Sequence, residues 1–471
     1  MPLHVLLIST YELGRQPFGL ASPAAWLARD GARVAMNDVA VEHLDEGAVR
    51  AAQLIAIYVP MHTAARIAAR VLPRVRALNP AAHIACYGLY APMNAGYLRS
   101  LGAQTILGGE FEAPLAALAR DIAAERPPAP LPEISVDRQQ FLAPARAGLP
   151  PLAHYARLSL PDGSEKAVGY TEASRGCKHL CRHCPVVPVY AGHFRVVDRD
   201  AVLADIRAQV AAGAQHITFG DPDFLNAPGH AMPLVRALHE QFPQLTYDVT
   251  IKIEHLLAHA RELPVLHETG CLIVTTAVES IDDDILALLD KGHTAADFAR
   301  AVALCRAAGV HLAPTFVTFM PWTTLPGFRA LLDRIDALDL VDSVAPIQFA
   351  IRLLVPAGSR LLELPEVRAL LGDFDDDAMS WRWTHSDPRV DALHAAVMAR
   401  IRRGEASGES RRVTFDAIRV IAQRALAGDA EESLSASAPL GTERVGTDAA
   451  IPAGLAPLRA PVPYLTEPWF C

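Results

Sequence analysis

The sequence lacks the features that would mark a membrane protein or a disulfide scaffold. It has no unbroken apolar stretch of about 18 residues. Its opening, MPLHVLLIST, has no basic leader and no small-residue cleavage site. Seven cysteines in 471 residues have neither the density nor the even number of a disulfide framework. We therefore expect a cytoplasmic protein with no membrane partner.

An excess of positive charge is also missing. The chain has 43 basic and 52 acidic residues, a formal net charge of -9, which opposes non-specific attraction to phosphate backbones. Nucleic acid is therefore not an expected partner. Apolar residues are abundant, at 51% hydrophobic against 20% charged, which is typical of a globular protein with sizeable cores. The length suggests about three structural units.

The first unit, residues 1–125, alternates short apolar runs with helical patterns. Such alternation predicts a parallel sheet covered by helices, a Rossmann-like doubly wound domain. Gly88, Gly108 and Gly109 follow strand-like runs, where they would let a bulky ligand approach the carboxyl ends of the strands. Ordinary turns between strands and helices are the alternative interpretation.

The remaining chain divides by composition. Residues 126–166 are rich in proline and are predicted to be a linker. Residues 167–365 repeat the alternation with six strand candidates, which fits a partial (β/α)6 barrel of the TIM type. We expect a helical C-terminal region at 366–428 and a flexible tail at 429–471 that ends in EPWFC. The predicted fold class is therefore α/β.

Three cysteines are crowded into the segment EASRGCKHLCRHCPV. Cys177, Cys181 and Cys184 are separated by three and then two residues, just after the first strand of the second domain. Thiolates are soft ligands for iron–sulfur clusters or zinc, and three of them leave one coordination site free on a four-iron cluster. A structural zinc site would need a fourth ligand, which His179 or His183 could supply. With no second cysteine pair, the cluster is favoured.

This spacing after the first strand of a partial barrel resembles the radical S-adenosylmethionine (SAM) superfamily. The resemblance implies that Cys177, Cys181 and Cys184 each ligate one iron of a [4Fe-4S] cluster and that the fourth iron chelates SAM. It also implies that an electron from the cluster splits SAM. The family commonly has an aromatic residue before the third cysteine, where this chain has His183. That difference weakens one expected adenine contact.

The same resemblance places SAM contacts at the strand ends of the barrel. Gly220 and Asp221, in FGDPDF, match the turn that binds the SAM amino group. Glu279 and Ser280, in AVES, match a position that contacts the ribose or the methionine end of SAM. A carboxylate suits ribose hydroxyls because it accepts both of their hydrogen bonds.

Two further candidates for SAM binding lie in apolar strand-like runs. Thr315 is in the fifth predicted strand and Arg352 in the sixth. A charge in a strand must be paired, so Arg352 is predicted to contact the SAM carboxylate or substrate, with a structural ion pair as the alternative. Lys291, in the LDKGHT turn, is interpreted as a solvated lysine.

The N-terminal unit resembles the cobalamin-binding domains that precede many radical SAM barrels, in its strand order and its GLYAP and GGEFE turns. The resemblance implies cobalamin as a further cofactor, with turns at Gly88, Gly108 and Gly109 near the corrin. Those domains often supply a histidine to cobalt after the first strand. Here that region is STYELGRQPFG, so cobalt ligation by histidine is not supported.

The whole chain resembles the radical SAM family named for its CUAEP or CCAEP tail, in which U is selenocysteine. The resemblance implies continuation beyond Cys471 with selenocysteine or cysteine and then Ala-Glu-Pro. A selenocysteine codon is a stop codon in ordinary translation, so the chain would be cut short at that point. A genuine terminus at Cys471 is the alternative. A tail chalcogen of this kind could act in catalysis as a soft ligand or redox partner, and an inert exposed thiol is the opposing interpretation.

Together these patterns predict an enzyme that cleaves SAM reductively and modifies a small-molecule substrate, with cobalamin-assisted methyl or other group transfer as one form. An electron donor such as flavodoxin or ferredoxin is an expected partner. One alternative reaction transfers the aminocarboxypropyl arm of SAM to a soft acceptor. An alternative from another class is a non-catalytic iron–sulfur or corrinoid redox sensor.

Overall fold

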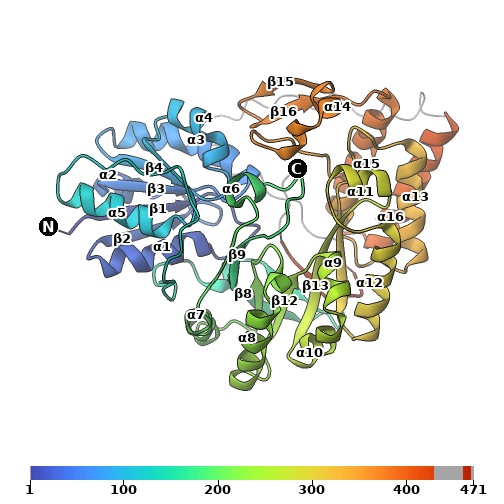
Figure 1. Ribbon diagram of the computed structural model, residues 1–471, viewed down its shortest axis with the longest axis horizontal. Helices are drawn as coiled ribbons and strands as arrows, with labels where there is room; N and C mark the ends of the chain where they lie inside the picture. Colours follow the sequence, from blue (N-terminus) through green and yellow to red (C-terminus); the bar gives the residue numbers. More distant parts are fainter. Residues whose placement is uncertain (1, 429–459, 468–471) are drawn as a thin grey trace.

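The computed structural model describes residues 2–428 and 460–467, and its N-terminal part is a six-stranded parallel sheet (Figure 1). The strand order is β2-β1-β3-β4-β5-β6. Its strands are β1 (His4–Ser9), β2 (Arg33–Asp38), β3 (Leu54–Tyr58), β4 (His83–Tyr87), β5 (Thr105–Gly109) and β6 (Ile134–Ser135). Strand β3, LIAIY, is buried along its whole length, as expected for a parallel strand covered on both faces.

Helices cover both faces of this sheet. Helices α1 (Phe18–Arg29) and α5 (Glu112–Ala123) pack on one face. The other face is covered by α2 (Glu46–Ala51), α3 (His62–Leu78) and α4 (Ala95–Ser100). This is the doubly wound domain that the sequence predicts.

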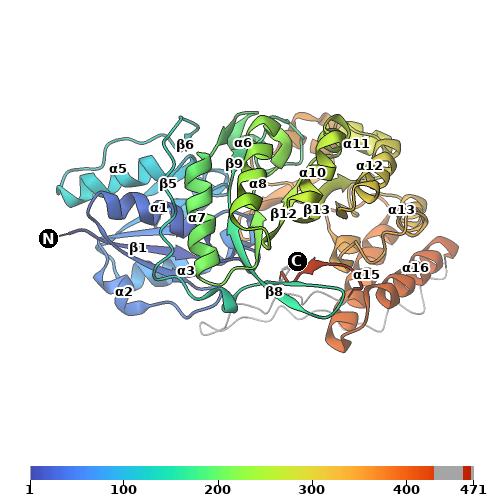
Figure 2. The same cartoon turned by 90° about the horizontal axis from the view of Figure 1, so that it is seen from below.

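The second sheet has seven strands in the order β14-β13-β12-β11-β8-β7-β17. Five of them run parallel: β8 (Glu165–Thr171), β11 (His216–Phe219), β12 (Thr246–Thr250), β13 (Cys271–Glu279) and β14 (His311–Phe316). Helices follow these strands along the chain, and Figure 2 shows several of them from below. Six share one core with the strands: α7 (Arg199–Ala211), α8 (Pro228–Gln241), α9 (Ile253–Ala258), α10 (Leu263–Glu268), α12 (Ala295–Ala307) and α13 (Leu325–Ala337). Helix α11 (Asp283–Leu288) packs through Ile285 in a separate, smaller cluster. The curled sheet is the predicted partial barrel.

The sixth predicted barrel strand is reduced in the structure. A 3-10 helix covers Pro346–Ala350, and only a single parallel bridge joins Arg352 to Phe319. Sequence pattern could not show this difference, because a buried 3-10 turn and a short buried strand are both apolar runs.

Part of the region predicted to be helical forms a hairpin. Strands β15 (Leu371–Asp375) and β16 (Ser380–Trp383) pair antiparallel, before helices α15 (Pro388–Ser407) and α16 (Arg411–Ala427). The hairpin reaches the N-terminal domain, where Tyr97 donates to Asp377 at 2.9 Å and Met379 enters the core. It therefore links the barrel to the N-terminal domain (Figure 1).

Part of the predicted flexible tail is ordered. Strand β17 (Tyr464–Leu465) pairs antiparallel with β7 (Arg157–Ser159) at the edge of the barrel sheet, where it is drawn in red in Figure 2. Positions 429–459 and 468–471, including Cys471, lie outside the described residues. In the described ranges, no helix combines the length and apolar character needed to cross a membrane.

Candidate functional site

The three cysteines lie on the loop that follows the short strand β9 (Ser174–Gly176), at the carboxyl end of β8. Cys177 and Cys181 are buried and Cys184 is half-buried. The loop begins at Gly176, which has a φ of 71°. A Cβ at this position would lie 2.4 Å from the carbonyl oxygen of His193, so the turn into the loop requires glycine.

The spacing of the three thiols fits a cluster better than a single ion. Thiolates on one tetrahedral zinc ion are roughly 3.8 Å apart, given a Zn–S bond of about 2.3 Å. Within residues 2–428 and 460–467, a single group of three or more His, Cys, Asp or Glu ligand atoms lies within 4.8 Å of one another. That group does not contain the cysteine sulfurs. Three thiols around a wider space match a four-iron cluster that leaves one iron free.

Burial decides the protonation state of the thiols when no metal is bound. Burial raises the pKa of Cys177 and raises that of Cys184 to about 12, and the neighbouring Cys181 adds to both effects. These groups would stay protonated without a metal, because a thiolate in such surroundings needs compensating positive charge.

Two buried lysines supply part of that charge. Lys252 Nζ lies 3.7 Å from the sulfur of Cys181. Burial alone would lower the pKa of Lys291, but Glu279 and then Cys181 and Cys184 raise it. Lys291 is only 3% exposed, so its interpretation as a solvated lysine is wrong.

Glu279 is part of an ion-pair network beside the cysteine loop. Its Oε1 lies 3.0 Å from His183 Nε2 and 3.2 Å from Lys291 Nζ. Burial alone would raise the pKa of Glu279, but Lys291 and then His183 lower it to about 2. Glu279 also has a φ of 67°, a left-handed backbone conformation that is uncommon outside glycine. Because its pKa is low, the Glu279 side chain is an anion at physiological pH.

A cavity of about 150 Å³ adjoins this network. Glu279 and Ser280 from the end of β13 line it with Thr318, Met320 and Trp322. The Ser280 hydroxyl accepts from the Asp282 amide at 3.1 Å. The predicted ribose-binding pair thus lies at a strand end beside a cavity.

Gly220 and Asp221, which the sequence assigns to SAM binding, contact neighbouring groups of the protein itself. Asp221, which is 3% exposed, accepts from the Ala173 amide at 2.9 Å and from the Ser174 hydroxyl at 2.5 Å. A Cβ on Gly220 would lie 1.8 Å from the hydroxyl of Tyr170. The turn after β11 therefore fixes the backbone that enters the cysteine loop.

Thr315 and Arg352 lie apart from this network in their contacts. The Thr315 hydroxyl contacts the carbonyl oxygen of Thr276 at 3.5 Å. Arg352 pairs with Asp391 at 2.7 Å, and its guanidinium lies 3.6 Å from the ring centroid of Trp383. Arg352 is therefore already paired within the protein. This arrangement is the structural ion pair given above as the alternative to a contact with SAM or substrate.

A second cavity, of about 190 Å³, lies between the N-terminal domain and the barrel. The N-terminal domain contributes Glu12, Tyr58 and Met61 from its strand ends, and the barrel contributes Tyr170 and Gly176. Gly176 directly precedes Cys177, so the cavity adjoins the cysteine loop. Ligands commonly bind at the carboxyl ends of parallel strands in such folds.

Glu12 is the least satisfied polar group of this cavity. It is 5% exposed, and its Oε2 has no hydrogen-bond partner among the described residues. Burial, and then the neighbouring Glu172, raises its pKa well above the ordinary value. A carboxyl oxygen without a partner at a cavity wall is available to hydrogen-bond a ligand.

The three glycines proposed to face a corrin pack against the protein. A Cβ on Gly88 would lie 2.9 Å from the carbonyl oxygen of Val59, and one on Gly108 would lie 2.2 Å from the Pro92 ring. A Cβ on Gly109 would lie 2.1 Å from the carbonyl oxygen of Ser135, although Gly109 also lines the 190 Å³ cavity. Close packing of strand ends already accounts for these glycines.

Arg175 is a residue that sequence reasoning missed. It is 6% exposed and pairs with Glu110 and Glu112 of the N-terminal domain, at 3.4 and 2.6 Å, and with Glu172 at 2.6 Å. The only signal in the sequence was a lone arginine next to the cysteine motif, and nothing there named its partners.

The C-terminal segment 460–467 is held beside the same cavity. The guanidinium of Arg15, which lines the cavity, pairs with Glu467, and the Thr466 amide donates to the Arg157 carbonyl at 2.8 Å. This contact joins the C-terminal segment to both domains.

Loss of the carboxylate of Glu467 is expected to loosen this segment. Glu467→Ala leaves the Arg15 guanidinium without its acceptor, which costs roughly 1–3 kcal/mol. Hydrogen exchange at the Thr466 amide should accelerate, while exchange in the β3 core should not change. Unaltered exchange at Thr466 would show that strand pairing alone holds the segment.

An α/β half-barrel with three cysteines at the carboxyl ends of its strands has the arrangement of an iron–sulfur enzyme. Comparison with known families is more specific. Residues 171–334 match the Radical SAM superfamily, so this part of the chain is a radical SAM domain, which indicates an enzyme of that class. Enzymes of the class use a [4Fe-4S] cluster and SAM.

A curated relative is tRNA-2-methylthio-N(6)-dimethylallyladenosine synthase of Chlorobium chlorochromatii. It is 24% identical over 221 residues, which cover 44% of this chain and 47% of the relative. The chain thus spans about half the length of this relative.

Two solved structures share most of the fold. One is TsrM from Kitasatospora setae, a radical SAM methyltransferase with tryptophan substrate and a SAM analogue bound, with a TM-score of 0.61 and 19% identity over 78% of this chain and 76% of that one. The other is the cobalamin-dependent SAM radical enzyme OxsB with aqua-cobalamin bound, with a TM-score of 0.64 and 12% identity over 90% and 72%. At these identities the likeness concerns the fold.

Proposed function

We propose that this chain binds a [4Fe-4S] cluster through Cys177, Cys181 and Cys184, cleaves SAM reductively and modifies a small molecule. The observation that carries the proposal is the set of three buried or half-buried thiols, too widely spaced for one ion, beside a cavity between two domains. When bound, the cluster would supply the electron that cleaves SAM.

The protein's own groups would hold the cofactors and keep water out. Lys252 and Lys291 offset the charge of the thiolates. Asp221 fixes the backbone before the cysteine loop. Glu279 and Ser280 at the 150 Å³ cavity are our candidates for SAM contacts, with Gly220, which follows β11 and lines the 190 Å³ cavity. Because Arg352 already has a partner, it ranks below them.

The small-molecule substrate is assigned to the 190 Å³ cavity. Its wall mixes aromatic and aliphatic side chains with the polar groups of Glu12 and Arg15. Ligand sites commonly combine apolar walls with a few polar groups in this way. A flavodoxin or ferredoxin is the electron donor that such a reaction would need.

Cobalamin is a second candidate cofactor, favoured by the shared two-domain arrangement with OxsB. The side chains as they stand do not accommodate it. The aromatic rings of Tyr58, Tyr87 and Phe111 pack together at the ends of the strands, with centroids 4.9–5.9 Å apart. We therefore assign no step to cobalamin.

The test is anaerobic reconstitution of the full chain, followed by metal and sulfide analysis and chromatography of SAM products after dithionite reduction. We expect about four irons per chain and 5'-deoxyadenosine as a product. Methylthioadenosine instead would indicate aminocarboxypropyl transfer. An intact cluster with uncleaved SAM would favour the redox sensor, and zinc without iron would overturn the proposal. Cobalt retained after gel filtration would support cobalamin.

A further inference from the structure

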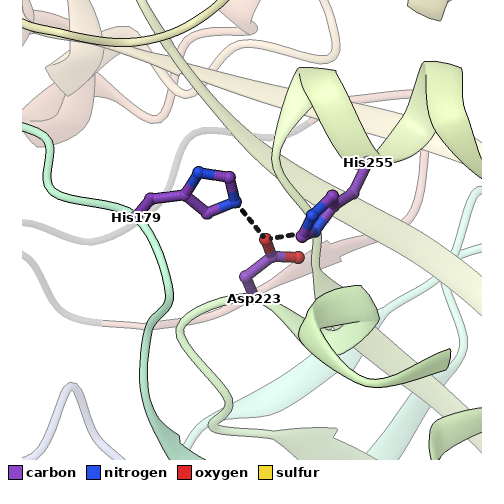
Figure 3. A group of neighbouring side chains, drawn as sticks. All are labelled: His179, Asp223 and His255. Carbon is purple, nitrogen blue, oxygen red and sulfur yellow. Dashed lines mark ion pairs between the residues drawn. The ribbon is translucent and has the colours of Figure 1, made fainter. Parts of the chain in front are cut away.

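Three side chains outside the cysteine set converge on one point (Figure 3). His179 comes from the cysteine loop, Asp223 from the turn after β11, and His255 from helix α9. One ligand atom from each lies within 4.8 Å of the other two, the only such group of three in the described ranges. Asp223 Oδ2 lies 2.6 Å from His255 Nδ1 and 3.8 Å from His179 Nε2.

The facing atoms lack hydrogen-bond partners. Asp223 is 0% exposed, and its Oδ2 has no partner of acceptable hydrogen-bond geometry. The same holds for His179 Nε2 and His255 Nδ1, although both face this oxygen. The other oxygen of Asp223 is occupied, since it accepts from the Leu225 amide at 3.3 Å. An unsatisfied buried carboxylate oxygen costs free energy that a cation would recover.

A second carboxylate stands behind one of the histidines. Glu254 Oε2 lies 3.5 Å from His179 Nδ1, on the opposite side of the ring from Asp223. Histidines that bind metals commonly donate their other ring N–H to a carboxylate, which fixes the tautomer and the ring orientation. The same oxygen of Glu254 forms an ion pair with Lys252, so Glu254 would do this for His179 while shared between the two.

We propose that His179, Asp223 and His255 form a binding site for a single divalent first-row metal ion, separate from the cysteine cluster, with Glu254 as an outer partner. Two imidazoles and one carboxylate suit Fe²⁺, Mn²⁺ or Zn²⁺ and leave coordination positions open. Adjacent ligands at about 2.1 Å from one ion are roughly 2.9–3.5 Å apart. The separations from Asp223 Oδ2, 2.6 Å to His255 and 3.8 Å to His179, lie just below and just above this range, so each would change by a few tenths of an ångström on binding.

The site is separate from the neighbouring Asp221. Asp221 is committed to Ala173 and Ser174, whereas Asp223 faces the two histidines. A substrate or SAM ammonium group is the competing occupant for an unpaired Asp223 oxygen. Metal binding in the absence of SAM distinguishes the two.

The probe is Mn²⁺ alone, added to the SAM-free, cluster-loaded full chain with the cluster oxidised and EPR-silent. Free Mn²⁺ is measured by EPR. We expect one bound Mn²⁺ per chain in addition to the cluster iron. His255→Gln and Asp223→Asn should weaken binding more than the 10–100-fold that loss of an outer partner costs, and Glu254→Gln should weaken it by about 10–100-fold.

His259→Gln is the matched control. His259 lies at the end of the same helix, with its ring 5.5 Å from that of His255, and is not a member of the group. It should bind Mn²⁺ like the parent chain. Unchanged iron and sulfide in every variant show that the cysteine cluster and the fold survive.

Absence of Mn²⁺ binding, repeated with Zn²⁺ by equilibrium dialysis, would overturn the proposal. So would equal losses in His259→Gln and His255→Gln. Weaker SAM binding in Asp223→Asn, with no metal bound to the parent chain, would assign the oxygen to the SAM ammonium instead. Because the readout is metal binding, it stands apart from the outcome of SAM cleavage.

Discussion

Cys181→Ala is expected to abolish SAM cleavage while leaving the chain folded. The thiol of Cys181 lies within reach of Lys252 and raises the pKa of both other cysteines, so it sits at the centre of the set. Two thiolates rarely hold a four-iron cluster, so iron should fall from about four per chain to below one. SAM products after dithionite should fall to background.

Cys305→Ala is the matched control for this result. Cys305 is 0% exposed in the barrel core, and burial raises its pKa to about 12. Its loss removes one sulfur from a packed core, a cost of about 1 kcal/mol, and should leave iron content and cleavage unchanged. Full iron and full cleavage in Cys181→Ala would show that the cluster lies elsewhere.

The architecture could be predicted because the chain carries strong local signals. Strand β3 is a continuous apolar run and α3 has polar and apolar faces, so alternation predicted the doubly wound domain. The cysteine spacing predicted the metal loop for the same reason, since the ligands lie close together in the chain. The half-barrel confirms the predicted architecture, whereas the metal loop stays a prediction.

The hairpin at 371–383 and strand β17 were missed for the opposite reason. Their stability comes from partners far away in sequence, such as Tyr97 for Asp377 and Arg157 for Thr466. The segment containing β15 has the acidic sequence GDFDDD, which is a poor strand signal by itself. Tertiary contact decided the local structure.

Pairing of charges was the other feature that sequence could not supply. Lys291 and Arg352 are single residues in the sequence, and their partners lie 12 and 39 positions away. A buried lysine and a solvated one look the same in the sequence. The His179, Asp223 and His255 group was hidden similarly, because it joins a loop, a turn and a helix that are far apart in the sequence.

The second large effect is expected at Arg175, which joins the two domains. Arg175→Met removes the cation with which the carboxylates of Glu110, Glu112 and Glu172 pair. Burial alone would raise the pKa of Glu112, but Arg175, together with hydrogen bonds from Ser22 and Gln139, holds it below its ordinary value. Burial raises the pKa of Glu110 to about 7. Breaking a buried charge network in this way costs about 3–5 kcal/mol.

We expect the urea midpoint of Arg175→Met to fall accordingly, and proteolysis of the 136–150 connection to accelerate as the domains separate. The double variant Arg175→Met/Glu112→Leu should recover part of the loss, because it replaces charges by apolar groups that can pack together. A generic loss of packing at position 175 predicts instead that the second substitution adds to the damage. Recovery in the double variant, with four irons retained, would therefore assign the effect to the unpaired carboxylates. It would identify Arg175 as a residue that holds the two domains together at the cavity between them.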